Sequence, residues 1–437
     1  MAGLLSTNLC EPCSKSELVY DQLPPVQTAI VDDYTVYCGP KSVIDGDAPL
    51  TFEITGSSDD YVDVSSISLR IKVKVLKENG DVLSEKDNVG PVNLFLHSLF
   101  SQLDVTLGDT LISQSTNTYA YRSYMTTLLS YAKDAKEGWL SLSGWHTDEA
   151  QKFDDPTNAG LKARSKWIQN GVEYEMKGRL HMDLGLQERL VPNGVDIRIT
   201  LTRNKPSFSF MGFDEGQGNY KINITHAQLE VRKVKLAPKE QLRIENTISK
   251  LGARLPIVHT VSKAFSIAQG ISTYDLDSLF TGQLPARIVL ALVENDAFNG
   301  TLKKNAFNFK NFDLSFMVLN VMGKQIPSKP LQPNFGAGHY IDAYETLYTG
   351  LSAYGENYDH GIKREDYPNG FCIYAFNLTP DQSSGMSHVN PRRVGTVRAT
   401  LHFAQALPCT VTLIAYAQFD NVITIDRFRN VIFDYAT

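Results

Sequence analysis

The chain has 437 residues, of which 42% are hydrophobic and 10% aromatic, so it is long enough for two or three β-domains with sizeable cores. Its formal net charge is −6 and neither half is basic, which argues against a protein that coats nucleic acid, because phosphate neutralisation supplies most non-specific affinity. No run approaches the length of a membrane span, and the start of the chain lacks a charged segment followed by an apolar one. We therefore expect no membrane insertion and no signal peptide.

The first 45 residues differ from the rest of the chain. They contain Cys10 and Cys13 in a C-x-x-C pair and the acidic pair Asp32-Asp33, and they have no sustained hydrophobic period. We predict an N-terminal arm over residues 1–45 that orders against the body of the protein or against a neighbouring chain. The cysteines are odd in number, and reduced thiols are their simplest interpretation.

From residue 46 onward, alternation of apolar and polar residues dominates. In 67–75 (ISLRIKVKV) every odd position is apolar and every even one polar, which is typical of a strand with one buried and one solvated face. Helical patterns are few and short. The chain is therefore predicted to be an all-β protein. The other predicted strands are 50–54, 103–107, 172–184, 195–202, 222–224, 229–236, 257–267, 288–293, 312–321, 371–376, 396–403, 411–416 and 422–425, and the predicted helices are 124–132, 239–249 and 341–354.

An internal repeat organises these strands. It consists of an alternating strand, a Gly turn and a return to apolar residues, then a Tyr-rich helical stretch, then a later alternating strand that follows Gly. An offset near 200 residues is far too long for a solenoid, so the repeat indicates two copies of one domain with seven or eight strands each. The matched stretches are 103–113 with 318–328, 124–131 with 344–354, and 194–201 with 395–401.

The predicted organisation follows from the repeat. An arm (1–45) precedes a first β-domain (46–237), a connector helix (238–252) and a second β-domain (253–437). The connector is placed where a helical pattern begins just after Pro238.

The sequence lacks the signatures of common catalytic and phosphate-binding sites. It contains no G-x-x-x-x-G-K-[ST], G-x-G-x-x-G, H-E-x-x-H or G-x-S-x-G, and its nine His never fall within three residues of one another. We predict no catalytic residues, no cofactor and no metal. Cys10 and Cys13 have half of a zinc-knuckle spacing that Cys38 and one His would complete; plain thiols or a contact made by the arm are the alternative.

Tyrosines gather in the predicted connecting stretches. Tyr supplies a large buried area with a polar end and is enriched where loops pack against other chains. Packing inside the same subunit is the alternative. The candidate inter-subunit contacts are Cys10, Cys13, Tyr119, Tyr121, Tyr124, Tyr340 and Tyr344.

Three segments near the start of the chain carry a resemblance to a known family. Residues 5–18 (LSTNLCEPCSKSEL), 89–105 (VGPVNLFLHSLFSQLDV) and 115–124 (STNTYAYRSY) resemble the double jelly-roll major capsid proteins of Polinton (Maverick) elements and their adintovirus relatives. Residues 376–381 (FNLTPD) are similar to the second-domain pattern of large DNA virus capsid proteins.

The resemblance implies two tandem eight-stranded antiparallel jelly rolls with few short helices, and a hexon-like structural protein rather than an enzyme. Family members form homotrimers with a six-cornered outline that tile an icosahedral shell around double-stranded DNA, and a single jelly-roll penton protein fills the five-fold vertices. The resemblance also implies a place in the virion, assembly in the host cytoplasm or nucleus, and at most non-specific contact with packaged DNA.

Three alternatives remain open at this point. They are a carbohydrate-binding jelly-roll protein, a metal enzyme of the cupin type, and a capsid relative that a host genome keeps for another purpose, because a fold does not fix a function.

Overall fold

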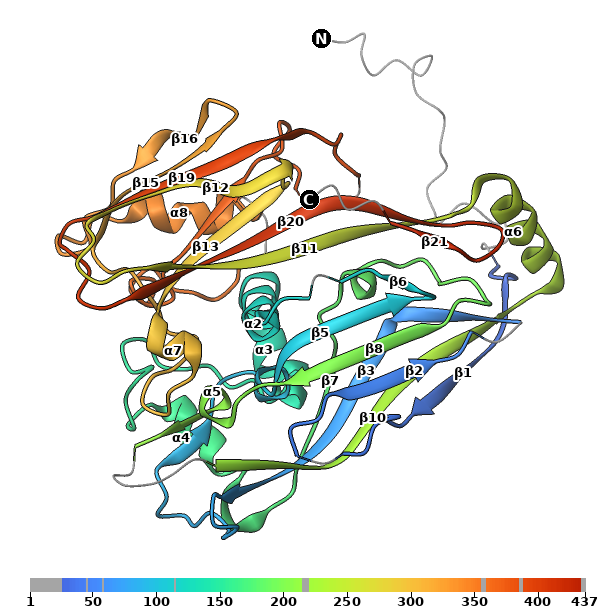
Figure 1. The fold of residues 1–437 in the computed structure, drawn as a ribbon, viewed down its shortest axis with the longest axis horizontal. Helices are drawn as coiled ribbons and strands as arrows, with labels where there is room; N and C mark the ends of the chain where they lie inside the picture. The colour runs from blue at the N-terminus through green and yellow to red at the C-terminus, as the bar shows by residue number, and fades with distance from the viewer. Residues whose placement is uncertain are drawn as a thin grey trace, which may run out of the picture.

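The structure is a computed structural model that describes residues 26–44, 46–56, 59–113, 115–213, 220–354, 359–384 and 388–433. Within them the chain forms two β-sandwiches, which lie side by side and are joined by helix α6 (Pro238–Leu251) (Figure 1). Pro238 opens α6 at its first turn and Gly252, at φ 71°, ends it.

The first sandwich consists of two four-stranded antiparallel sheets. One has the order β1-β10-β3-β7 and the other β2-β8-β5-β6, and a small sheet pairs β4 with β9. The strands are β1 (Ile30–Cys38), β2 (Leu50–Ile54), β3 (Asp60–Lys77), β4 (Val89–Pro91), β5 (Phe100–Leu107), β6 (Thr110–Leu111), β7 (Tyr174–Arg179), β8 (Ile197–Arg203), β9 (Phe210–Gly212) and β10 (Tyr220–Leu236).

The second sandwich repeats this arrangement. Its sheets have the orders β11-β20-β13-β18 and β12-β19-β15-β16; β21 pairs with β20, and β14 pairs with β17. The strands are β11 (Ala253–Ile267), β12 (Thr273–Gln283), β13 (Arg287–Glu294), β14 (Phe309–Lys310), β15 (Leu314–Val321), β16 (Lys324–Leu331), β17 (Asn369–Gly370), β18 (Ile373–Asn377), β19 (Val394–Phe403), β20 (Val411–Ile425) and β21 (Val431–Ile432).

Both sandwiches have one topology. When the strands of the large sheets are counted in chain order within each half, both halves have the sheet orders 1-8-3-6 and 2-7-4-5. This is the eight-stranded, two-sheet arrangement of a jelly roll. The predicted fold, two tandem antiparallel jelly rolls, is confirmed. The stretches matched by the sequence repeat are topologically equivalent: hairpin β5–β6 with β15–β16, helix α2 with α8, and β8 with β19.

Helices are short and lie mainly in the connections between strands. Those of the first jelly roll are α1 (Phe95–Ser98), α2 (Tyr119–Ser130), α3 (Lys133–Glu137), α4 (Ala159–Ser165) and α5 (Pro206–Ser209); those of the second are α7 (Asn295–Asn299) and α8 (Ile341–Thr349). Within the described ranges, every helix is too short or too polar to cross a membrane.

Several element boundaries differ from the prediction. Residues 30–38 of the predicted arm form β1, which pairs with β10 and so belongs to the first jelly roll. Strands β12 and β16 were not predicted, and β10 and β20 are each continuous where two strands were predicted. The strand predicted over 172–184 ends at Arg179, because the chain then turns into a 3-10 helix. Cys10 and Cys13 lie outside the described residues.

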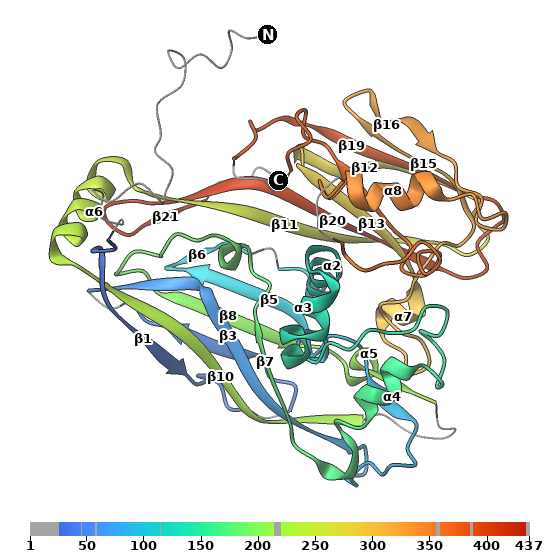
Figure 2. The same ribbon diagram turned by 180° about the vertical axis from the view of Figure 1, so that it is seen from behind.

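The two jelly rolls share their hydrophobic cores. The start of β11 and the end of β20 run over the first jelly roll (Figure 2). The core of the first jelly roll therefore includes four residues of these strands: Leu255, Ile257, Ile423 and Ile425. In the opposite direction, α2 contributes to the core of the second jelly roll. The end of the connector at residue 252 is therefore no boundary between two independent cores.

Candidate functional site: the junction between the jelly rolls

Helix α2 lies between the two jelly rolls (Figure 1). Its aromatic side chains contact rings of the second jelly roll. Tyr124 stacks on Phe307 with ring centroids 4.1 Å apart and an interplanar angle of 2°, and it also stacks on Trp145. Tyr121 stacks on Phe298 at 5.4 Å. Because Phe298 and Phe307 belong to the second jelly roll, these rings join the two halves of the chain. Each such pair contributes about 0.5–1.5 kcal/mol beyond the burial of its area.

The predicted contact residues divide into two groups. Tyr119, Tyr121 and Tyr124 are buried, so packing inside one subunit accounts for these side chains. Tyr340 and Tyr344 lie at the start of α8 in the second jelly roll and are only partly buried. For these two residues, contact with another subunit stays a prediction.

A buried carboxylate fixes the position of one jelly roll relative to the other. Asp183 accepts a hydrogen bond from Arg122 at 2.6 Å, lies 2.6 Å from Nδ1 of His259 and accepts from the backbone N–H of Thr260 at 3.2 Å. His259 and Thr260 belong to β11 of the second jelly roll. Burial raises the pKa of Asp183, but the charge of Arg122 and the hydrogen bond with His259 outweigh that effect, so the pKa is lowered and the carboxylate is ionised.

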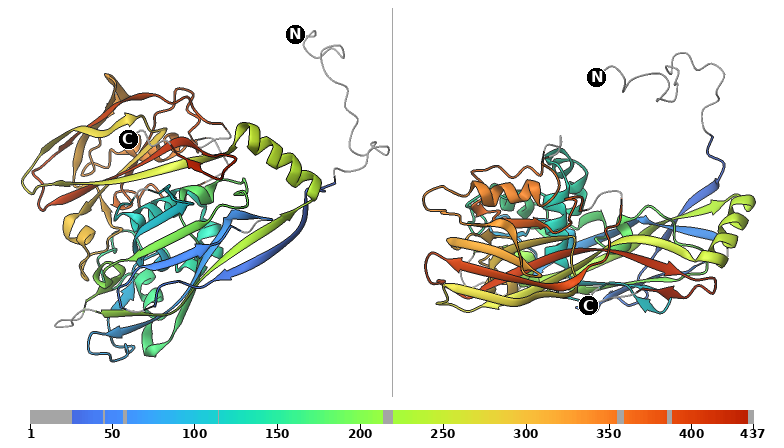
Figure 3. Two further views of the ribbon diagram at one scale, coloured as in Figure 1. Left: turned by 45° about the vertical axis from the view of Figure 1, so that its right-hand side comes forward. Right: turned by 90° about the horizontal axis from the view of Figure 1, so that it is seen from above.

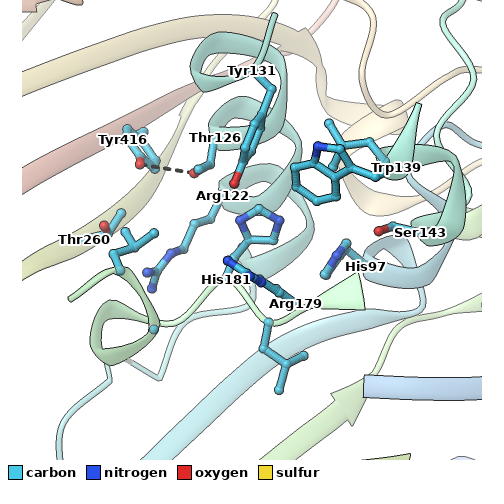
Figure 4. Close-up of a pocket in the computed structure, with 14 residues that line it drawn as sticks. His97, Arg122, Thr126, Tyr131, Trp139, Ser143, Arg179, His181, Thr260 and Tyr416 are labelled. Atoms are coloured by element: carbon cyan, nitrogen blue, oxygen red, sulfur yellow. Dashed lines mark hydrogen bonds between the residues drawn. The ribbon is translucent and has the colours of Figure 1, made fainter. Parts of the chain in front are cut away.

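Two histidines line, together with Arg122, a cavity of about 60 Å³ at the junction (Figure 4). The rings of His97 and His181 are 4.7 Å apart, and Nδ1 of His97 lies 2.9 Å from the hydroxyl of Tyr119. Burial lowers the pKa of His97 to about 3 and that of His181 well below its ordinary value, so both are neutral at pH 7. Small-molecule sites measure roughly 300–1,000 Å³, so this cavity is too small for a substrate.

Further polar contacts hold the junction at both of its ends. At one end, Asp154 accepts hydrogen bonds from the backbone of Asn305 and from the side chain of Asn308, both at 2.7 Å. At the other end, Arg429 donates to Asn193 and Glu245, also at 2.7 Å. The two jelly rolls are therefore joined along their length.

Sequence reasoning found the tyrosines of this site but missed its polar residues. Asp183 and His259 are 76 residues apart and come from different jelly rolls, so no local motif marks them. In the described part of the chain, no three His, Cys, Asp or Glu residues are arranged to hold a metal ion.

Comparison with known proteins relates this architecture to others. No family model matches the chain. The uncharacterized protein F54H12.2 of Caenorhabditis elegans is 25% identical over 427 residues, which are 94% of this chain and 99% of that protein.

Solved structures match over nearly the whole chain. A chain of the Sputnik virophage structure superposes with a TM-score of 0.66 at 10% identity, covering 98% of this chain and 93% of that one. The Faustovirus major capsid protein gives a TM-score of 0.62 at 9% identity, covering 93% and 92%. This chain has the double jelly-roll fold. The mavirus major capsid protein shares this fold as well, with a TM-score of 0.54 at 11% identity over 98% and 96%.

The aromatic packing at the junction yields a matched pair of variants. We expect Tyr121→Ala to lower the free energy of unfolding by about 3–5 kcal/mol, because it removes a ring buried between both jelly rolls. The Tyr121 hydroxyl is buried and has no hydrogen-bond partner among the described residues. Tyr121→Phe should therefore equal the wild type or exceed it by up to about 1 kcal/mol. Urea unfolding monitored by circular dichroism measures both, and equal losses in the two variants would contradict the packing argument.

The buried carboxylate yields a second prediction. We expect Asp183→Asn to lower the free energy of unfolding by about 3 kcal/mol, because the largely buried Arg122 then loses its counter-charge. Asp109→Asn, at the exposed turn between β5 and β6, is the control and should change stability by about 0.5 kcal/mol or less. A loss for Asp183→Asn no larger than that of the control would show that the cluster does not hold the junction.

Neutral, buried His97 predicts a dependence of stability on pH. Its pKa is about 3 in the folded chain and near 6.5 when exposed, so between these values the unfolded chain binds a proton that the folded chain excludes. The contribution of His97 to the free energy of unfolding is therefore fully present above about pH 6.5. Below that pH it falls by about 1.4 kcal/mol per pH unit. We expect His97→Gln to flatten the fall between about pH 5 and 6.5 in urea titrations. An unchanged slope would count against a neutral His97.

Proposed function

We propose that this chain is the major capsid protein of a double-stranded DNA virus or virus-like element, and that it forms pseudo-hexagonal homotrimers which tile an icosahedral shell. The observation that carries the proposal is the duplication. One jelly roll occurs twice, and buried contacts such as that between Asp183 and His259 join the two copies into a single unit. Three such chains present six similar sandwiches, so one kind of subunit fills a six-cornered lattice position.

The comparisons support the capsid role. The solved structures that superpose on nearly the whole chain include the major capsid proteins of Faustovirus and mavirus. At the junction the Asp183 carboxylate is paired with Arg122, with His259 and with the backbone of Thr260, which favours a structural role for it over catalysis.

The origin, location and partners of the protein belong to the same proposal. We infer an element of the Polinton or adintovirus kind, and a full-length relative in C. elegans supports an element carried in animal genomes. The protein would reside in the virion, assemble in the host cytoplasm or nucleus, and need a penton protein at the five-fold vertices. Contact with packaged DNA would be weak, because basic residues such as Arg232 and Lys304 are already paired with carboxylates.

Purification of the full chain tests the proposal. We expect mass photometry to find a particle of three 48.7 kDa chains, and negative-stain microscopy to show triangular or hexagonal outlines. A stable monomer, glycan binding without particles, or stoichiometric bound metal would each contradict it.

The arm is tested separately. Removing residues 1–25 leaves β1 in place. If this segment links neighbouring trimers, the shortened chain should still form trimers but should fail to form closed shells. Shells that resemble those of the wild type would exclude this role.

A further inference from the structure

Equivalent helices of the two jelly rolls are buried to different extents. Helix α2 is buried on nearly all sides, since it lies between the jelly rolls. Helix α8 is its equivalent and buries only one side, through Ala343, Thr346 and Leu347. Figure 3 shows α8 (orange) and the helices around α2 (teal) on the same side of the strands. The other side of α8 is accessible, and Ile341 is 51% exposed.

The side of α8 that carries exposed Ile341 and half-buried Tyr344 corresponds to the side of α2 that crosses the junction. With the offset of 220 residues between the matched helical stretches, Tyr121 aligns with Ile341 and Tyr124 with Tyr344. Tyr121 and Tyr124 are the residues that stack on the second jelly roll. We call Ile341, Asp342, Tyr344 and Glu345 the α8 ridge.

The equivalent sheets β11-β20-β13-β18 and β1-β10-β3-β7 also differ in how their outer faces are buried. In the second jelly roll, β13 and the first half of β20 are buried on both faces, and the first jelly roll covers the outer one. In the first jelly roll, the equivalent strands β3 and β10 alternate, so their sheet is buried on one face only. Strand β1 of the same sheet leaves Val31 64% and Tyr37 60% exposed. Among the described residues, nothing covers the outer face of the first jelly roll, whereas the equivalent face of the second is covered.

The outer face of this sheet carries two lysines without an ion pair among the described residues, while its carboxylates Glu175 and Glu230 are paired with Arg70 and Lys177. Lys72 and Lys74 point outward from β3, because their neighbours at odd positions fill the core, and neither makes an ion pair with another described residue. On the α8 ridge, Asp342 and Glu345 are exposed, and only Asp342 has an ion-pair partner among the described residues, Lys329 at 3.5 Å. We call the outer face of sheet β1-β10-β3-β7 the docking face.

We infer that the α8 ridge of one copy packs on the docking face of a second copy, so that the junction inside a chain is repeated between chains. The inference rests on the proposed trimer and names the surfaces that build it. Because the ridge and the docking face differ, the contact is head-to-tail. In a closed ring of three chains, each α8 ridge then lies on the docking face of the next chain. Opposite charges at the rim of an interface favour the correct pairing of the surfaces.

Charge reversal tests the two surfaces in the full chain. We expect Lys72→Glu with Lys74→Glu to raise the dissociation constant of the trimer at least tenfold, and Asp342→Lys with Glu345→Lys to do the same. A chain that carries all four changes should regain trimers, because both surfaces are then reversed. Mass photometry over a concentration series measures this. Lys239→Glu with Lys250→Glu on α6 makes the same change of charge elsewhere and should leave the trimer intact.

The outcomes separate this inference from the proposed function. If the wild-type chain forms no trimer, the proposed function fails. If the wild type is trimeric and both reversed pairs stay trimeric like the α6 control, the surfaces are wrong while the trimer stands. Circular dichroism verifies that each variant is folded.

Cross-linking of the unmodified chain gives a second measurement. A zero-length reagent that joins amines to carboxylates should link Lys72 or Lys74 to Asp342 or Glu345. In trimers reassembled from ¹⁴N- and ¹⁵N-labelled chains, these links should include mixed-isotope peptides. Mixed links confined to other surfaces would overturn the inference.

Discussion

The sheet formed by β11, β20, β13 and β18 is apolar on both of its faces over much of its area, and the rest of the chain is arranged to cover the outer one. A jelly roll alone buries only the inner face of each sheet, so the run IVLALV in β13 would leave a large apolar surface in water. The first jelly roll removes that surface with α2 and its neighbouring loops. Association of the two halves is therefore driven mainly by hydrophobic burial.

The polar contacts at the junction have a different role from the apolar ones. Burial of rings is tolerant of small rotations, whereas the geometry around Asp183 is directional, with partners from both jelly rolls. A buried ion pair adds little net stability but strongly disfavours arrangements that leave a charge unpaired. The cluster therefore fixes one relative orientation of the two jelly rolls. A subunit that must repeat many times in a regular lattice needs such a fixed orientation.

Much of the fold could be predicted from the sequence, and the missed strands have identifiable reasons. Strand β1 (IVDDYTVYC) is exposed on both faces and shows no period. Strand β12 contains an irregularity between Leu276 and Phe280 that breaks its alternation, and β16 contains two prolines. In β10, a bulge at Ile224 and His226 divided one strand into two predicted ones. Regular alternation is thus visible in sequence, while bulges and exposed edge strands are not.

The site was predictable only in part. The clusters of Tyr indicated a contact surface, but the sequence could not tell whether the contact lies within one subunit or between two. For Tyr121 and Tyr124 it lies within the subunit, because the partner rings of Phe298 and Phe307 come from the other copy of the repeat. The pairing of Asp183 with His259 depends on how the two copies pack, and neither copy shows that by itself.

The shared cores have a consequence for synthesis of the chain on the ribosome. Ile423 and Ile425 complete the core of the first jelly roll, although they are translated long after its own strands. The first half therefore emerges with part of its interior still open, for the time that about 190 more residues take at roughly 5–20 residues per second. A chain that stalls before Ile423 completes neither half. Only chains translated past Ile425 then have both cores filled, which keeps shorter products out of any assembly.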